Sequence, residues 1–152
     1  MENIAALLQK IKVASFPKLS NTEIHLAFVS HKSFIAATRL STPFKPYEIR
    51  LNLDDVKKMG EFELTGVLAH ELVHIDEWNK LFFIQKIFHL YQSKDEKFVT
   101  KDERDTDLKV IGLGYGQQLL AFQQYHDKYY KAYKSGDGLT KKEIREILKA
   151  FK

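Results

Sequence analysis

Two histidines and a glutamate stand close together in the run His70-Glu71-Leu72-Val73-His74. In a helix, positions four apart lie on one face, so both imidazole rings can reach a single metal ion. Glu71 is one residue, or about 100°, further round, where its carboxylate can contact a water molecule beside that ion without binding the ion itself. The spacing therefore predicts a metal site with a general base next to it.

The residues around this motif predict that it is helical. Residues 61–78 contain no proline, and apolar side chains recur there at helical spacing. These side chains are Leu64, Val67, Leu68, Leu72 and Ile75. The alternative is a buried helix whose histidines are hydrogen-bonded core residues. We favour the metal site, because a glutamate between two apolar runs would need a partner if it were buried.

The third protein ligand must come from elsewhere in the chain, because a catalytic zinc usually takes three protein ligands and a water. The chain has no cysteine, so this ligand is a histidine or a carboxylate. The nearest downstream candidates are His89 and the acidic cluster at residues 102–107. We prefer Glu103, because Glu103 and Asp107 would share one helix face. One carboxylate could bind the metal while the other accepts the N–H of a ligand histidine.

The pattern His70-Glu71-x-x-His74 followed by Glu103-x-x-x-Asp107 resembles the gluzincin clan of zinc metallopeptidases, and the small size resembles its single-domain minigluzincins. The resemblance implies that His70, His74 and Glu103 bind one Zn²⁺ ion, while Asp107 orients the His70 ring. It also implies a zinc-dependent endopeptidase in which Glu71 is the general base that activates a zinc-bound water for attack on a peptide bond.

This resemblance covers residues 45–120 and implies a small zincin-like domain of the α+β class, with residues 1–152 forming one domain. Thr106 stands where related families have alanine, so the subfamily is left open. Strands are expected at residues 24–30, 34–40 and 47–53, with a tight turn at residues 31–32. Helices are expected at residues 2–14, 54–60 (capped by Asp54 or Asp55), 61–78, 81–90, 103–111, 117–134 and 141–150.

Several details of the site are expected from these elements. The run 47–53 alternates between apolar and polar residues, which predicts one buried and one open face. By resemblance, the open edge of this strand would bind an extended peptide substrate. Tyr115 and His126 are candidates for a further donor to the oxyanion. The glycines at residues 112–116 are expected to end a helix and to allow close packing. Residues 81–90 are too short and too polar to span a bilayer, which predicts a core helix or an apolar wall beside the site. A contact with a membrane surface or with a partner is the less favoured alternative.

Composition is ordinary for a globular protein, with 44% hydrophobic and 29% charged residues and a formal net charge of +4. The N-terminus lacks the pattern of a secretory signal, so a cytoplasmic location is expected.

Two other functions are considered. One is a latent or non-catalytic zinc domain acting through protein contacts, self-inhibited by residues 135–152 or covered by a neighbouring molecule. The other, less favoured, is a basic helical module that binds nucleic acid through residues 128–152. Because a solvated helical face is the more favoured interpretation of these residues, no nucleic-acid partner is expected.

Overall fold

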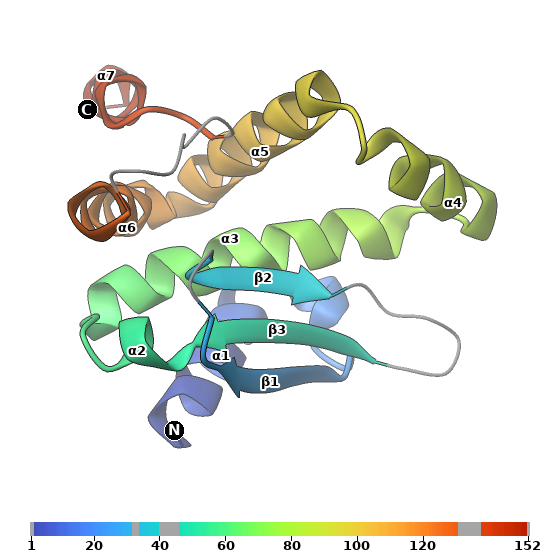
Figure 1. Cartoon of the computed structure of the whole chain (residues 1–152), viewed down its shortest axis with the longest axis horizontal. Coiled ribbons are helices and arrows are strands. Elements are labelled where there is room, and N and C mark those ends of the chain that lie inside the picture. Colours follow the sequence, from blue (N-terminus) through green and yellow to red (C-terminus); the bar gives the residue numbers. More distant parts are fainter. Residues whose placement is uncertain (1, 32–33, 40–45, 131–137, 152) are drawn as a thin grey trace.

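A three-stranded sheet lies on one side of a long central helix, and further helices cover the other side (Figure 1). The computed structural model describes residues 2–31, 34–39, 46–130 and 138–151. Its α+β architecture confirms the predicted class. The elements are α1 (Glu2–Ser15), β1 (Ile24–Val29), β2 (Ala36–Arg39), β3 (Tyr47–Asn52), α2 (Leu53–Val56), α3 (Glu61–Lys80), α4 (Phe83–Gln92), α5 (Glu96–Val110), α6 (Gly116–Tyr129) and α7 (Lys141–Ala150).

The sheet has the strand order β1-β3-β2. β3 pairs in parallel with β1 and antiparallel with β2. Two sequence predictions are therefore wrong. β1 and β2 are not neighbours, so no hairpin joins them, although residues 32–33 themselves lie outside the described part. β3 is the central strand, so its edges are not open. The alternation of Tyr47, Ile49 and Leu51 correctly marked a buried face, but alternation does not reveal which strands pair.

Helix α3 is the centre of the fold, and it lies between the sheet and helices α5 and α6 (Figure 1). Leu68, Leu72 and Ile75 are fully buried on it, as their spacing predicted. Gly66 faces the backbone of α6, where a Cβ atom would lie 2.6 Å from the carbonyl carbon of Gln118. The absence of a side chain at Gly66 therefore lets α3 and α6 approach closely.

Helix α5 ends at Val110, directly before the glycine-rich segment, as predicted, and the chain bends within this segment. A π-helical turn at Ile111–Tyr115 joins the two helices, and Gly114 has a φ of 91°. Such a positive φ is accessible to glycine at little cost, which explains the residue at this bend. Gly116 serves close packing as expected, since a Cβ atom there would lie 2.6 Å from Leu148 Cδ2.

A buried polar network fastens α6 to the end of β3. Asn52, not Asp54 or Asp55, caps α2, since its side-chain oxygen accepts the backbone N–H of Asp54 at 3.2 Å. Asp55 is instead buried and accepts hydrogen bonds from the hydroxyl groups of Tyr125, at 2.7 Å, and of Tyr130. The predicted cap was wrong because both aspartates suit a cap by type, and only the chain path decides between them and Asn52.

Helix α4 differs from the expected core helix. Part of it does line a cavity beside α3, through His89 and Leu90. However, most of its large apolar side chains are exposed, including Ile84 at 79%. Within the described ranges, no helix has the length and apolar character needed to cross a bilayer.

Candidate metal centre

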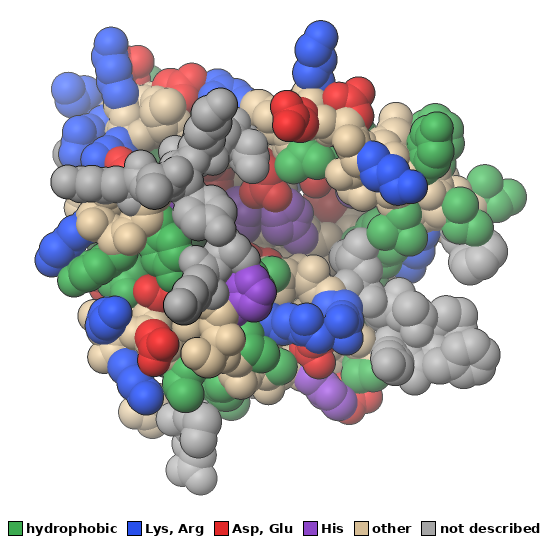
Figure 2. Space-filling view, in the orientation of Figure 1, with side chains coloured by type: hydrophobic (Ala, Val, Ile, Leu, Met, Phe, Trp, Pro, Cys, Tyr) green, Lys and Arg blue, Asp and Glu red, His purple; other side chains and the backbone are tan. Residues whose placement is uncertain are grey.

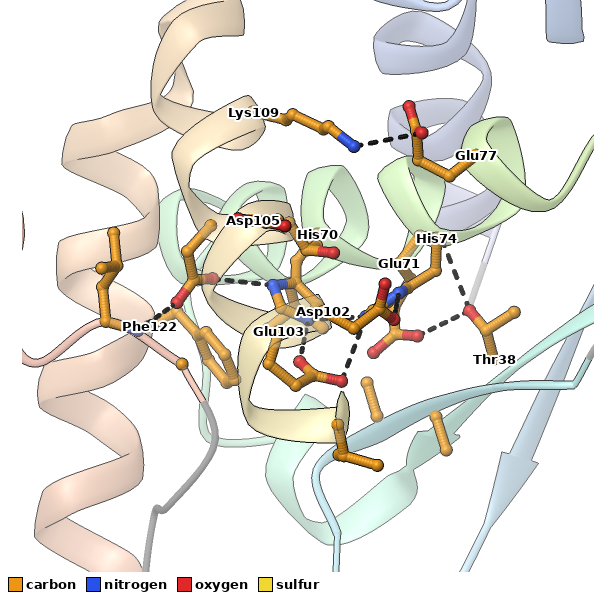
Figure 3. Close-up of a pocket in the computed structure, with 18 of the residues that line it drawn as sticks. Thr38, His70, Glu71, His74, Glu77, Asp102, Glu103, Asp105, Lys109 and Phe122 are labelled. Atoms are coloured by element: carbon orange, nitrogen blue, oxygen red, sulfur yellow. Dashed lines mark hydrogen bonds and ion pairs between the residues drawn. The ribbon is translucent and has the colours of Figure 1, made fainter. Parts of the chain in front are cut away.

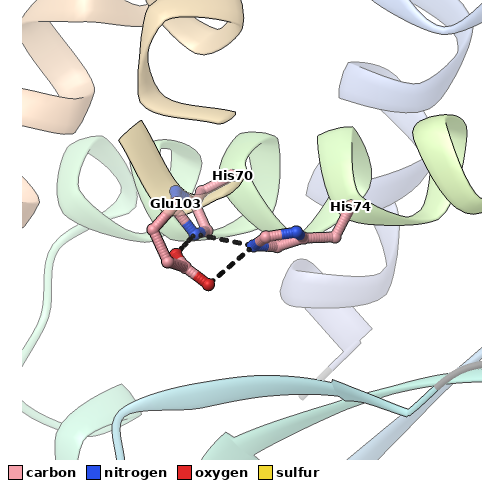
Figure 4. Close-up of side chains that lie close together, drawn as sticks. All are labelled: His70, His74 and Glu103. Atoms are coloured by element: carbon pink, nitrogen blue, oxygen red, sulfur yellow. Dashed lines mark hydrogen bonds and ion pairs between the residues drawn. The ribbon is translucent and has the colours of Figure 1, made fainter. Parts of the chain in front are cut away.

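Two histidines of α3 and one glutamate of α5 converge on a common point (Figure 4). The Nε2 atoms of His70 and His74 are 3.1 Å apart. The Glu103 carboxylate lies 3.0 Å from His70 Nε2 and 3.4 Å from His74 Nε2. A tetrahedron with metal–ligand bonds of roughly 2.0 Å has edges of about 3.3 Å, so these separations fit three ligands of one ion. The group could hold a metal ion, and it contains the residues that the sequence predicted.

The electrostatics of the cluster favour close contact between opposite charges. Burial alone would lower the pKa of His70, but hydrogen bonds with Asp107 and Glu103 raise it well above its usual value. Burial would likewise raise the pKa of Glu103, yet hydrogen bonds with His70 and His74 hold it far below its usual range. Because a metal ion needs neutral imidazole and ionised carboxylate, protons compete with the ion for the same atoms.

Asp107 is hydrogen-bonded to the His70 ring. One carboxylate oxygen lies 2.9 Å from His70 Nδ1, and the other accepts the backbone N–H of Leu139 at 2.7 Å. The side chain is fully buried. Gly138 passes directly over it, where a Cβ atom would overlap the carboxylate oxygen. Since an imidazole whose Nδ1–H is held presents Nε2 to a metal, this contact places the His70 donor toward the cluster.

Glu71 of α3 reaches toward strand β2 of the sheet (Figure 3). It is 7% exposed, and one of its carboxylate oxygens accepts the hydroxyl of Thr38 on β2 at 2.6 Å. This hydroxyl is a partner that the sequence prediction missed. No local signal could have found it, because Thr38 and Glu71 are 33 residues apart and meet only through the packing of β2 on α3.

The cluster opens into a cavity of about 1110 Å³. Figure 2 shows histidine and acidic side chains inside a hollow near the centre of the view. Its walls come from β2, α3, α4, α5, α6 and the start of the C-terminal segment at residues 138–142. A cavity of this size accepts a segment of extended chain or a small molecule.

The structure does not bring every candidate into the cluster. His89, the alternative third ligand, has its Nε2 3.8 Å from Asp102, and its ring stands edge-on against Trp78 and Phe98. Asp102 in turn lies 3.9 Å from His74 Nδ1. His89 therefore lies one layer outside the three converging residues, with Asp102 between it and His74.

The two candidates for a donor to the oxyanion, Tyr115 and His126, lie in different places. Tyr115 hydrogen-bonds with Ser15 at 2.8 Å and is not part of the cavity wall. His126 does line the cavity. Its Nδ1 is buried and has no hydrogen-bond partner within the described residues, although Asp127 lies 3.7 Å away. Of the two, His126 is the one that lies in the cavity wall.

The three residues of the cluster and Asp107 were all predicted from spacing within two helices, whereas Thr38 and the Leu139 backbone were not. Comparisons with models of protein families, with curated proteins and with solved structures found no match to this chain. The assignment of the site therefore depends on its residues and their geometry.

Proposed function

We propose that this protein is a zinc-dependent endopeptidase of the gluzincin type, with His70, His74 and Glu103 as ligands and Glu71 as general base. One observation carries this proposal: the two imidazoles of His70 and His74 converge with the Glu103 carboxylate. Glu71, on the same helix as the two histidines, supplies a second carboxylate beside them. Two imidazoles and a carboxylate are a common ligand set for catalytic zinc, and they leave a position open. When bound, zinc supplies a Lewis acid that polarises the scissile carbonyl and makes water more acidic.

The residues of the chain have separate roles in the proposed reaction. Glu71 accepts a proton from the attacking water and delivers it to the leaving amine. The Thr38 hydroxyl fixes one oxygen of this carboxylate, which leaves the other oxygen to receive the proton. Asp107 holds the His70 ring in the orientation that directs Nε2 at the ion. His126, which lines the same cavity, is the proposed N–H donor to the developing oxyanion.

The substrate is proposed to lie along β2 and not along β3. β2 is an outer strand of the sheet, and Ala36, Ala37 and Thr38 line the cavity. An outer strand has unpaired backbone groups on one side, to which an extended peptide can add as a further strand. Such pairing reads the main chain of the substrate, so it favours unstructured polypeptides over a particular sequence.

The decisive experiment combines metal analysis with hydrolysis of an unstructured protein such as casein. The substitution Glu71→Gln should lower the rate by about 10²–10⁴-fold while zinc content stays the same. Glu61→Gln is the matched control, because Glu61 is an exposed glutamate at the start of the same helix. Unchanged proteolysis by Glu71→Gln would remove the general base from the proposal. Failure of the reconstituted wild-type chain to hold zinc would remove the site.

A latent zinc domain is the second candidate, and the position of the C-terminal segment favours it. Residues 138–142 form part of the cavity wall, and Glu143 pairs with Arg104 of α5 at 2.7 Å. Truncation would be a poor test, because it would also remove the buried side chains of Leu139 and Ile144. Glu143→Gln instead removes the charge that pairs with Arg104, while glutamine can still accept the backbone N–H of Thr140 at the start of α7. A rise in casein hydrolysis in this variant supports latency, and an unchanged rate argues against it.

A further inference from the structure

Helix α4 turns its apolar side away from the protein. Amphipathic helices of globular proteins normally bury their apolar stripe. In α4 the half-buried side instead carries three polar residues, Lys86, His89 and Gln92. The side chains that point outward form what we name the α4 surface, and each is more than half exposed. This surface consists of Phe82, Ile84, Ile87, Phe88, Leu90 and Tyr91.

The α4 surface is a single patch at one end of the molecule. Helix α4 stands at the right of Figure 1, and Figure 2 shows hydrophobic side chains gathered at that place. Ile84, Tyr91 and Phe88 are 79%, 72% and 62% exposed. A contiguous exposed patch of large apolar side chains marks a surface that is covered when the protein functions.

The charge around this patch indicates what covers it. Residues 78–94 contain three lysines and no acid, and this run lies between the acidic pairs Asp76-Glu77 and Asp95-Glu96. Of the three lysines, Lys80 is paired with Asp76 and Glu77. The ammonium groups of Lys86 and Lys94 lie 5.8 Å from the ring centres of Trp78 and Tyr91, respectively. Neither of these two lysines is paired with an acid anywhere in the described ranges. An apolar face flanked by unpaired lysines is typical of helices that lie in the surface of anionic membranes.

A second copy of the chain fits this surface less well. In a two-fold dimer the same patch meets itself. The unpaired Lys86 and Lys94 would then be brought near the same two lysines of the other copy, and the nearest acids along the chain lie outside residues 78–94. The patch also belongs to one short helix of 10 residues, whereas stable protein interfaces bury about 800 Å² on each partner.

We propose that α4 docks the protein on anionic phospholipid membranes, with the α4 surface in the boundary between headgroups and acyl chains. Lys86 and Lys94 then lie at the level of the headgroups. Because His89 and Leu90 also line the cavity, docking places the cavity beside the membrane. This inference does not depend on the proposed peptidase activity, since it follows from the exposed apolar side chains and the lysines of α4 and not from metal binding or from Glu71.

Sedimentation with lipid vesicles tests the proposal directly. The full chain should bind vesicles of phosphatidylserine mixed with phosphatidylcholine, but not phosphatidylcholine alone, and high salt should weaken the binding. The double variant Ile84→Gln/Phe88→Gln should bind at least about tenfold more weakly, because it removes two apolar side chains from the contact. The matched control is Val13→Gln/Phe62→Gln, which alters two other exposed apolar residues and should bind like the wild type.

A fluorescent label distinguishes insertion by α4 from adsorption by another basic region. The chain has no cysteine, so Tyr91→Cys and Val13→Cys each accept one environment-sensitive dye. Anionic vesicles should shift the emission of the label at Tyr91 to the blue and leave the label at Val13 unchanged. Equal binding by Ile84→Gln/Phe88→Gln and the wild type would overturn the proposal. So would an absence of vesicle binding, including the case in which sedimentation velocity shows an α4-dependent dimer.

Discussion

Asp55 and Asp107 are both buried carboxylates, with exposed fractions of 3% and 0%, and both oxygens of each accept hydrogen bonds. They differ in the groups that they bind. Asp55 accepts from two tyrosine hydroxyls of the α6 region, whereas Asp107 accepts from a candidate metal ligand and from a backbone N–H. Burial and complete hydrogen bonding therefore do not distinguish a structural carboxylate from a functional one. The chemistry of the partner does.

The largest expected effect is on stability, in Asp55→Ala. This substitution leaves the hydroxyls of Tyr125 and Tyr130 without their charged acceptor. Hydrogen bonds to charged groups contribute about 1.5–3 kcal/mol each, so the free energy of unfolding should fall by roughly 3 kcal/mol or more. Urea denaturation measures the loss. Zinc affinity of the folded fraction should stay unchanged, and a parallel loss of zinc affinity would break the distinction between the two aspartates.

Asp107→Ala should instead act on the metal site. Removing the carboxylate that holds a ligand histidine typically lowers metal affinity by 10–100-fold. Competition with a chelator of known affinity measures this change. Asp107→Asn is the control for shape, because it keeps the size of the side chain and can still accept a hydrogen bond from His70 Nδ1–H. If Asp107→Ala held zinc as tightly as the parent, Asp107 would be a structural residue like Asp55.

Gly138→Ala should be a milder form of the same perturbation. The new methyl group would overlap the Asp107 carboxylate, so either residue 138 or the carboxylate must move. We expect a loss of zinc affinity smaller than tenfold. Gly112→Ala is the matched control, since no atom lies within 4 Å of a Cβ there. An effect of equal size at both glycines would show that the contact at Gly138 is unimportant.

The smallest expected effect is a pH dependence confined to the Asp55 network. Burial and the hydrogen bond to Asp55 raise the pKa of Tyr130 from 10.0 to about 12. Because the folded-state pKa is the higher one, the stabilising contribution is complete below pH 10 and is lost as the pH rises through about 12. Urea midpoints across this window should fall less in Tyr130→Phe than in the wild type. Identical alkaline profiles would show that Tyr130 does not contribute.

The sequence was most informative where function is local in the chain. His70, Glu71 and His74 share one helix, and Glu103 and Asp107 share another, so spacing within each helix predicted which side chains would lie together. Nothing local could pair β2 with β3 or bring Thr38 to Glu71. Such contacts are decided by the packing of elements that are distant along the chain.

Helix α4 shows a different limit. Its sequence has the apolar content of a core helix, and periodicity alone cannot say whether an apolar stripe faces the protein or the solvent. The outward direction follows from the half-buried positions of Lys86, His89 and Gln92. The predicted wall beside the site was right for His89 and Leu90, and the predicted core helix was wrong.

The hydrogen bond from the backbone N–H of Leu139 to the Asp107 carboxylate has a thermodynamic consequence. The same carboxylate touches both the C-terminal segment and the His70 ring. If seating this segment raises the affinity for an ion by some factor, the bound ion must tighten the seating by the same factor. Binding of an ion at the centre would then stabilise the last helix, and the amides of α7 would exchange more slowly when zinc is added.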